Sequence, residues 1–123
     1  RDRSVSRGLG DVYKRQPYAE EAFDAIIVTN YLYRAHFPHY WRSLKSGGLF
    51  LMETFTTVNT AIWGRPRSPE HVLQPGELLR LAPPEARICA YEEGLNADEL
   101  GLERIVWLKP GDAEVLALRL GAR

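Results

Sequence analysis

The chain has little cysteine and no long hydrophobic run. Its single cysteine, Cys89, excludes an internal disulfide and fits a reducing compartment, so we expect a cytoplasmic protein. Cys89 sits in an alternating apolar run, which predicts a core position. No apolar run approaches the roughly 18 residues that a membrane-spanning helix needs, and no apolar region typical of a signal peptide is visible. We therefore expect no membrane partner.

The formal net charge is +0, but the charges are distributed unevenly. Residues 1–16 carry five basic and two acidic side chains, which leaves 11 basic and 14 acidic side chains for the rest of the chain. A mildly acidic body lacks the clustered lysine and arginine that phosphate binding needs. We therefore expect no nucleic-acid partner.

The first 16 residues, RDRSVSRGLGDVYKRQ, have neither helical nor strand periodicity. They contain too few apolar side chains to order themselves by burial. The string resembles a translated cloning or adapter remnant; the alternative is a basic arm that binds an acidic partner. We therefore expect a non-native or disordered leader at 1–16 and a single domain at 17–123.

The stretch from Phe23 to Phe55 predicts one βαβ unit. Four consecutive apolar residues, at positions 25–28, are typical of a strand in a parallel sheet that is covered on both faces. A second buried strand is predicted for Leu49 to Thr54. A crossover between such strands is nearly always right-handed, so both strands should end at the same edge of the sheet.

The predicted crossover is a short helix that ends by Leu44. Phe37, Tyr40, Trp41 and Leu44 are spaced along one helical face, and Pro38 suits the first turn. The glycine pair at 47–48 is expected to supply the left-handed stop after the helix.

The second half of the chain predicts a long loop, a short helix and two strands. Thr56 to Leu73 has no periodicity and is expected to be a functional loop, while Glu77 to Leu81 predicts a helix. Arg87–Glu92 and Glu103–Lys109 predict antiparallel strands. The segment 115–120 suits either a strand or a helix.

Polar side chains follow both strands of the βαβ unit. Thr29, Asn30 and Tyr31 follow the first strand, and Glu53 and Thr54 end the second. In open α/β sheets, ligands bind in the crevice outside the carboxyl ends of the strands. The sequence therefore predicts a small-molecule site here, although the glycine-rich loop that usually completes such a site is missing.

Three stretches together resemble class I S-adenosylmethionine-dependent methyltransferases. FDAIIVTNYLYR resembles their fourth strand and its loop, and LKSGGLFLMETF resembles the fifth strand with its preceding helix end. GRPRSPEHVLQPGELL is similar to a segment of bacterial tellurite-resistance-type methyltransferases. The resemblance covers about residues 22–81. It implies an α/β fold that is the C-terminal half of a Rossmann-like sheet, with parallel strands followed by an antiparallel pair.

The resemblance implies S-adenosylmethionine as cofactor, with Thr29, Asn30 and Tyr31 near its amino-acid end or its methyl group. In the simpler alternative, Asn30 only satisfies a turn. The family's glycine-rich loop and its ribose-binding acidic residue are absent, and Gly8-Leu9-Gly10 is no substitute because no strand precedes it. We therefore expect a fragment with one unpaired sheet edge that binds the cofactor only weakly by itself.

Three further residues are candidates for substrate binding, and each has a simpler role. His36 suits a general base, because its ordinary pKa is near neutrality, or a packing residue. Glu53 suits substrate orientation or a solvated strand end. Arg65 suits an anionic acceptor or a charged loop. The set His36, His39 and His71 has poor spacing for a metal, so we expect none.

The sequence therefore predicts methyl transfer from S-adenosylmethionine to a small-molecule acceptor by an intact parent protein, with the fragment inactive alone. One alternative is a non-catalytic α/β interaction or regulatory module. Another is part of a nicotinamide-dependent oxidoreductase, which the predicted antiparallel terminal strands disfavour. The sequence identifies neither the acceptor nor the oligomeric state.

Overall fold

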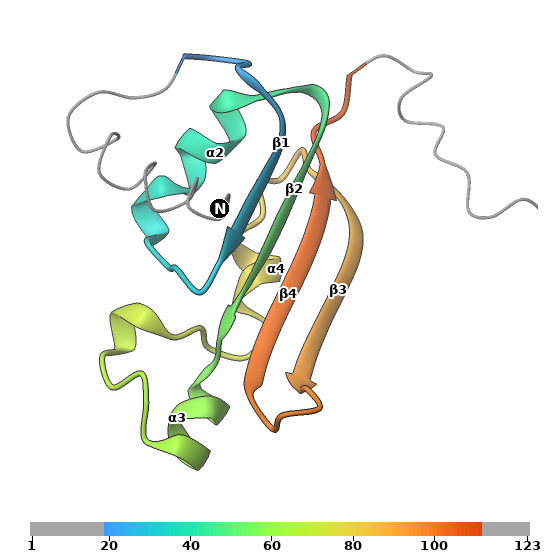
Figure 1. Ribbon diagram of the computed structural model, residues 1–123. Coiled ribbons are helices and arrows are strands. Elements are labelled where there is room, and N and C mark those ends of the chain that lie inside the picture. The colour runs from blue at the N-terminus through green and yellow to red at the C-terminus, as the bar shows by residue number, and fades with distance from the viewer. Residues whose placement is uncertain (1–18, 112–123) are drawn as a thin grey trace, which may run out of the picture.

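The computed structural model describes residues 19–111, which form one four-stranded sheet with helices on one face (Figure 1). The leader at 1–16 and the ambiguous segment 115–120 lie outside the described residues. None of the helices in the described part is long and apolar enough to cross a membrane.

The sheet has the strand order β1-β2-β4-β3. Strand β1 (Phe23–Thr29) pairs in parallel with β2 (Leu44–Phe55). Strand β4 (Gly101–Leu108) pairs antiparallel with both β2 and β3 (Arg87–Leu95). The predicted fold class, parallel strands followed by an antiparallel pair, is therefore confirmed.

Helix α2 (Phe37–Ser43) forms where the aromatic spacing predicts it. It buries Phe37 and Tyr40 against Phe50 of β2, and Pro38 lies in its first turn. The helix ends earlier than expected, because Leu44 is already extended and begins β2. Gly47, with φ of +85°, therefore lies inside an irregular part of the strand and does not stop the helix.

The segment expected to be a long loop contains a helix that the sequence analysis missed. Helix α3 spans Thr57–Trp63. Thr56 caps it by accepting a hydrogen bond from the Val58 N–H at 3.2 Å, and Gly64, with φ of +77°, ends it. The threonine and glycine signals were present, but a seven-residue helix carries too little periodicity to reveal itself.

The helix and the strand pair predicted for the second half of the chain are present, but two predictions of burial are wrong. The strand β1, expected to be covered on both faces, leaves Ile27 52% exposed. Helix α4 occupies Glu77–Leu81 as expected, and β3 and β4 are antiparallel neighbours. The core position predicted for Cys89 is wrong: the residue is exposed. It lies on an edge strand at a register shift between Ile88 and Ala90, where the alternation of the strand is interrupted.

The core lies on one face of the sheet, beneath α2 and α4. The side chains of Phe50, Met52 and Trp107 are 0% exposed there, and the rings of Phe50 and Trp107 stack with centroids 4.5 Å apart. The opposite face carries Ile27 and Leu49, which are 52% and 43% exposed. The sheet thus has a covered face and a bare face within the described part of the chain.

Candidate functional site

The carboxyl ends of β1 and β2 lie side by side, as the sequence predicts. The Asn30 N–H donates to the Glu53 carbonyl at 3.0 Å, which joins the two strand ends. Asn30 has φ of +54°, in the left-handed region where asparagine is tolerated better than most residues. The chain therefore turns sharply after β1 and opens a crevice at this edge of the sheet.

Two adjoining cavities form this crevice. One has a volume of about 330 Å³ and is lined by Asn30, Tyr31, Leu32, Thr54, Phe55, Pro66 and His71. The other has a volume of about 470 Å³ and is lined by Tyr31, Leu32, Tyr33, Arg34, Ala35, Glu70 and His71. They share Tyr31, Leu32 and His71, so one continuous crevice runs from the end of β2 to the loop after β1.

A buried asparagine braces the far wall of the crevice. Asn59, on α3, is 2% exposed, and its Nδ2 donates to the Arg65 carbonyl at 2.8 Å. Its Oδ1 accepts from the Gly101 N–H at 2.9 Å, which ties the wall to β4. Thr60 donates its hydroxyl to the Pro66 carbonyl at 2.6 Å. These bonds fix the position of Pro66, which lines the cavity.

Arg34 clamps the near wall to the start of α4. Its Nε and Nη2 donate to the two carboxylate oxygens of Glu77 at 2.5 and 3.0 Å, and Nη2 also donates to the Val72 carbonyl at 2.8 Å. The bidentate hydrogen bond and the charge of Arg34 hold the pKa of Glu77 below its ordinary value, and the Arg34 pKa is raised by the same bond. The loop that carries His71 is thereby fixed across the crevice.

The three predicted cofactor-binding residues are brought together at this edge. Asn30 and Tyr31 line the crevice, and Thr29 ends β1 beside Glu53. Their position fits the predicted cofactor role of Thr29, Asn30 and Tyr31, which stays a prediction.

His36, predicted to bind substrate, lies behind the crevice wall. It is 1% exposed and packs among aromatic rings, with its centroid 4.5 Å from that of Tyr33 and 5.9 Å from that of Tyr40. This environment agrees with the packing role considered for it, and its substrate role stays a prediction.

The other two predicted substrate residues, Glu53 and Arg65, are not among the residues that line the two cavities. Glu53 accepts a hydrogen bond from the Arg104 Nε at 3.0 Å on the bare face, where Arg104 also pairs with Glu92 at 2.5 Å. Arg65 is exposed, and its described bond is through its carbonyl oxygen. Substrate binding by Glu53 and Arg65 remains untested.

The structure adds His71 and Arg34 to the candidate site. The sequence analysis considered His71 only as a metal ligand, and within the described residues no group of three or more His, Cys, Asp or Glu could hold a metal ion. His71 is exposed and lines both cavities. Nothing in the sequence around His71 predicts that the loop brings this residue next to Asn30 and Tyr31, which follow β1. Only the fold shows this position.

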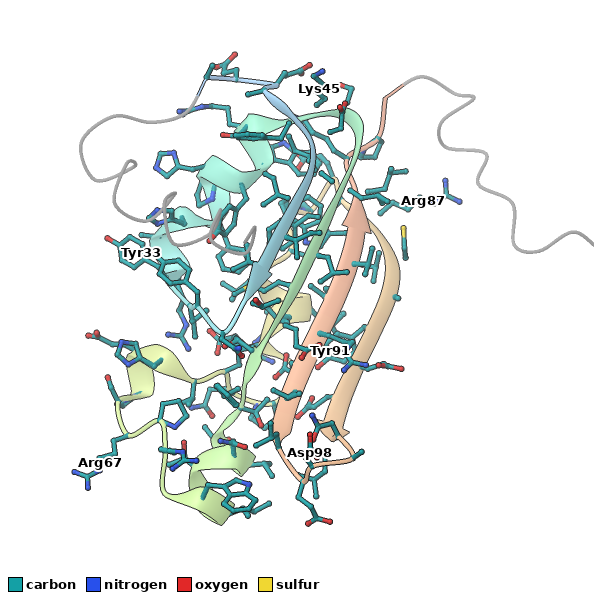
Figure 2. All side chains as sticks on the ribbon, in the orientation of Figure 1. Tyr33, Lys45, Arg67, Arg87, Tyr91 and Asp98 are labelled. Atoms are coloured by element: carbon teal, nitrogen blue, oxygen red, sulfur yellow. The ribbon has the colours of Figure 1, made fainter. Side chains whose placement is uncertain are left out.

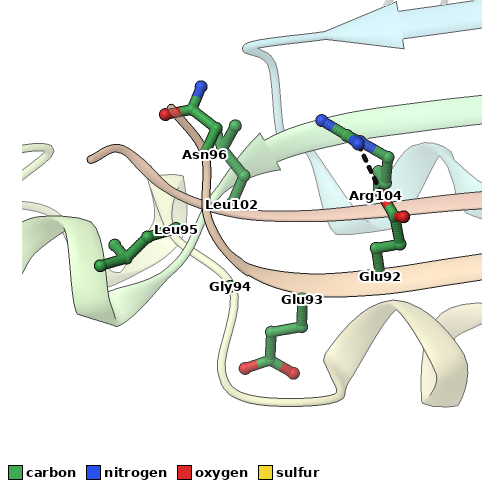
Figure 3. A pocket seen from close by; sticks show the side chains of 7 residues that line it. All are labelled: Glu92, Glu93, Gly94, Leu95, Asn96, Leu102 and Arg104. Atoms are coloured by element: carbon green, nitrogen blue, oxygen red, sulfur yellow. Dashed lines mark hydrogen bonds and ion pairs between the residues drawn. The ribbon is translucent and has the colours of Figure 1, made fainter. Parts of the chain in front are cut away.

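A further cavity lies beside the β3–β4 turn (Figure 3). It has a volume of about 360 Å³ and is lined by Glu92, Glu93, Gly94, Leu95, Asn96, Leu102 and Arg104. Its charged side chains already pair within the chain, since Arg104 bonds Glu92. The crevice at β1 and β2 is therefore the better candidate for a small-molecule site.

No protein-family model matches the chain, and no curated protein matches it. Solved structures match its fold. The [4+2]-cyclase SpnF has a TM-score of 0.60 at 16% identity, and the match covers 89% of this chain and 60% of that chain. The N-methyltransferase NodS from Bradyrhizobium japonicum WM9 has a TM-score of 0.56 at 17% identity, with 90% of this chain and 70% of that chain covered.

A SAM-dependent methyltransferase from Methanosarcina mazei has a TM-score of 0.52 at 15% identity, with 77% of this chain and 63% of that chain covered. The chain therefore spans less than two thirds of the length of SpnF and of the Methanosarcina protein. These likenesses and the strand order show a partial Rossmann-like methyltransferase fold. Because one of these structures is a cyclase, the fold alone does not define the reaction.

Proposed function

We propose that the chain supplies one wall of a methyltransferase site and, within a complete protein, takes part in methyl transfer from S-adenosylmethionine to a small molecule. The observation that carries the proposal is the crevice at the carboxyl ends of β1 and β2, in a sheet with methyltransferase-like strand order. We also propose that the parent protein is similar to tellurite-resistance-type methyltransferases. In this proposal, residues 1–16 are a leader and residues 17–123 are part of the methyltransferase domain.

The crevice fits part of the cofactor. Asn30 and Thr54 offer amide and hydroxyl groups at the strand ends, and Tyr31 and Pro66 offer apolar surface. Within residues 19–111, no glycine-rich turn joins a strand to a helix, so the described part lacks the usual cradle for the rest of the molecule. The residues present thus suit one wall of the site.

The residues of the crevice would act mainly by orientation. S-adenosylmethionine, when bound, supplies a sulfonium-activated methyl group that passes in line to a nucleophile on the acceptor. Asn30 and Tyr31 would fix the cofactor side, and the loop held by Arg34 would position His71 on the acceptor side. Much of the acceleration of an in-line displacement can come from alignment of the nucleophile, the methyl carbon and the sulfur.

Calorimetric titration with S-adenosylmethionine tests the proposal. We expect weak binding, in the millimolar range, that is further weakened in Asn30→Gly, which removes the side-chain amide while suiting the positive φ. Glu85→Gln, an exposed change far from the described contacts of the crevice, is the matched control. Micromolar affinity would contradict a one-wall site. Complete absence of binding would favour the non-catalytic module instead.

A further inference from the structure

Three consecutive residues at the start of α4 connect different parts of the molecule. The Gly76 N–H donates to Glu93 Oε1 at 3.0 Å, and the Leu78 N–H donates to Glu103 Oε1 at 3.0 Å. Between them, Glu77 holds Arg34 at the crevice. The first turn of α4 therefore links two carboxyl groups of β3 and β4 to the crevice wall.

The two glutamates that carry these carboxyl groups, Glu93 and Glu103, lie directly opposite each other in the sheet. Glu93 and Glu103 are register partners in the antiparallel β3–β4 pair, a position where like charges destabilise a sheet. Tyr91 donates its hydroxyl to Glu93 Oε1 at 2.9 Å. Figure 3 shows Glu93 projecting to the opposite side of β3 from the Glu92–Arg104 pair. Both side chains thus project toward α4, on the side of the covered face, where Glu103 is buried and Glu93 is exposed.

Glu103 is the more buried of the two. It is 0% exposed, and its Oε2 has no hydrogen-bond partner among the described residues. Burial raises the pKa of Glu103 most, the Leu78 N–H opposes the shift, and the charge of Glu93 adds to it. Burial also raises the pKa of Tyr91, as do its hydrogen bond to Glu93 and the negative charge of Glu103. An ionised carboxylate in this place would be costly.

A proton on Glu103 fits the surroundings of Glu93 and Glu103 better than a bound metal cation does. The groups facing Glu103 are Tyr91 and Glu93 on β3, the N–H groups of Glu77 and Leu78 on α4, and its register partner Thr54 on β2. The Leu78 N–H already places partial positive charge on Oε1 of Glu103. Protonation of the free oxygen removes the like-charge contact without displacing this donor.

We propose that Glu103 carries a proton when α4 is closed and forms, opposite Glu93, a proton-sensitive latch on the start of α4, which controls how firmly Glu77 holds Arg34 at the crevice. With the proton present, the pair accepts the Gly76 and Leu78 N–H groups without repulsion. Loss of the proton places two adjacent negative charges beneath α4. Opening of this turn, which exposes Glu103 to water, then becomes easier.

The direction of the pH dependence follows from linkage. Glu103 has a higher pKa in the closed state than in the open state, where about 4.3 is the ordinary value. The closed state therefore binds more protons, and its advantage is complete below about 4.3 and is lost as the pH rises to the closed-state pKa. Hydrogen-exchange protection of the Gly76 and Leu78 amides should fall by up to about tenfold per pH unit in this interval.

Amide hydrogen exchange by NMR, corrected for intrinsic rates, tests the latch on the whole chain. We expect protection of Gly76 and Leu78, and of the Arg34 Nε–H, to fall together with rising pH. Glu103→Gln, which keeps the accepting oxygen without a charge, should make this protection independent of pH. Glu93→Gln should move the fall to lower pH, and Glu85→Gln should leave it unchanged.

Several results would overturn the latch. Protection that is flat with pH in the unmodified chain would overturn it, as would a pH dependence that persists in Glu103→Gln. A change at Gly76 and Leu78 that never reaches Arg34 would overturn the link to the crevice. If Glu103→Gln does not fold, the side-chain carboxyl ¹³C shift of Glu103 decides: titration at or below its ordinary pKa contradicts the proposal. None of these results depends on cofactor binding.

Discussion

The two faces of the sheet are built by the same strands but have different partners. In β1, Val28 is 0% exposed on the covered face, whereas its neighbour Ile27 is 52% exposed on the bare face. Figure 2 shows side chains from the helices filling the space over the covered face. The described residues therefore complete one core and leave a second apolar surface that no other described residue covers.

The bare face has two distinct parts. Ile27, Leu51 and Val106 are aligned across β1, β2 and β4 by the strand register and form an apolar band. Toward the carboxyl end of β2, the same face carries the ion pairs of Arg104 with Glu53 and Glu92. The run of apolar residues in β1 predicts that both faces of this strand are buried. The described residues bury only one face of it.

The two faces should differ most in the free energy of unfolding that is lost when the largest buried aromatic side chain, Trp107, is removed. Trp107→Ala removes a side chain that is 0% exposed and stacked on Phe50, so we expect a loss of about 4 kcal/mol in the free energy of unfolding. Val106→Ala, on the neighbouring half-buried position of the bare face, should cost about 1 kcal/mol or less. Urea unfolding followed by circular dichroism measures both, and equal losses would refute the two-face description.

A matched pair within β1 gives a finer test. Val28→Ala should lower the free energy of unfolding by about 2 kcal/mol, because it leaves a gap against the helices. Ile27→Ala removes more atoms but from an exposed side chain, so we expect about 0.5 kcal/mol. A larger loss for Ile27 than for Val28 would mean that the bare face is covered in solution.

The charged pairs of Arg34, at the crevice, and of Arg104, on the bare face, should differ less in their contributions to the free energy of unfolding. Arg34→Met removes the bidentate pair with Glu77 and two bonds to carbonyl oxygens, and we expect a loss of about 2 kcal/mol. Arg104→Met breaks exposed pairs and should cost about 0.5 kcal/mol. Chemical denaturation at neutral pH gives both values, and a greater cost for Arg104 would contradict the ranking.

The Arg34–Glu77 pair gives the free energy of unfolding a pH dependence that is opposite in sign to the one expected for Glu103. Because Arg34 lowers the folded-state pKa of Glu77, the stabilisation is present above the ordinary value of about 4.3 and is lost as the pH falls through the folded-state pKa. The unfolding free energy of Arg34→Met should therefore decline less on acidification than that of the unmodified chain. An unchanged acid slope would show that Glu77 is not the group responsible.

Local signals in the sequence predict much of the fold. The aromatic spacing in α2, the proline and glycine before α4 and the pairing of β3 with β4 all appear as expected. Helix α3 and the exposed Cys89 were missed, because a short helix lacks periodicity and a strand at the sheet edge need not bury its alternating residues.

The site could be predicted only where it depends on strand ends. The position of Asn30 and Tyr31 follows from the βαβ pattern alone. Arg34 and Glu77 are 43 residues apart, and their pairing depends on the path of the intervening loop. The same is true of Glu93 and Glu103, whose opposition arises from the register of two strands.

We propose that the crevice at the ends of β1 and β2, and not the cavity beside the β3–β4 turn, receives S-adenosylmethionine. Amide chemical-shift mapping by NMR during titration of the chain with this compound tests it most directly. We predict shifts concentrated at Asn30, Tyr31, Thr54 and His71, which line the crevice. Shifts concentrated at Glu92, Gly94 and Asn96 instead, or no concentration at either cavity, would contradict the account.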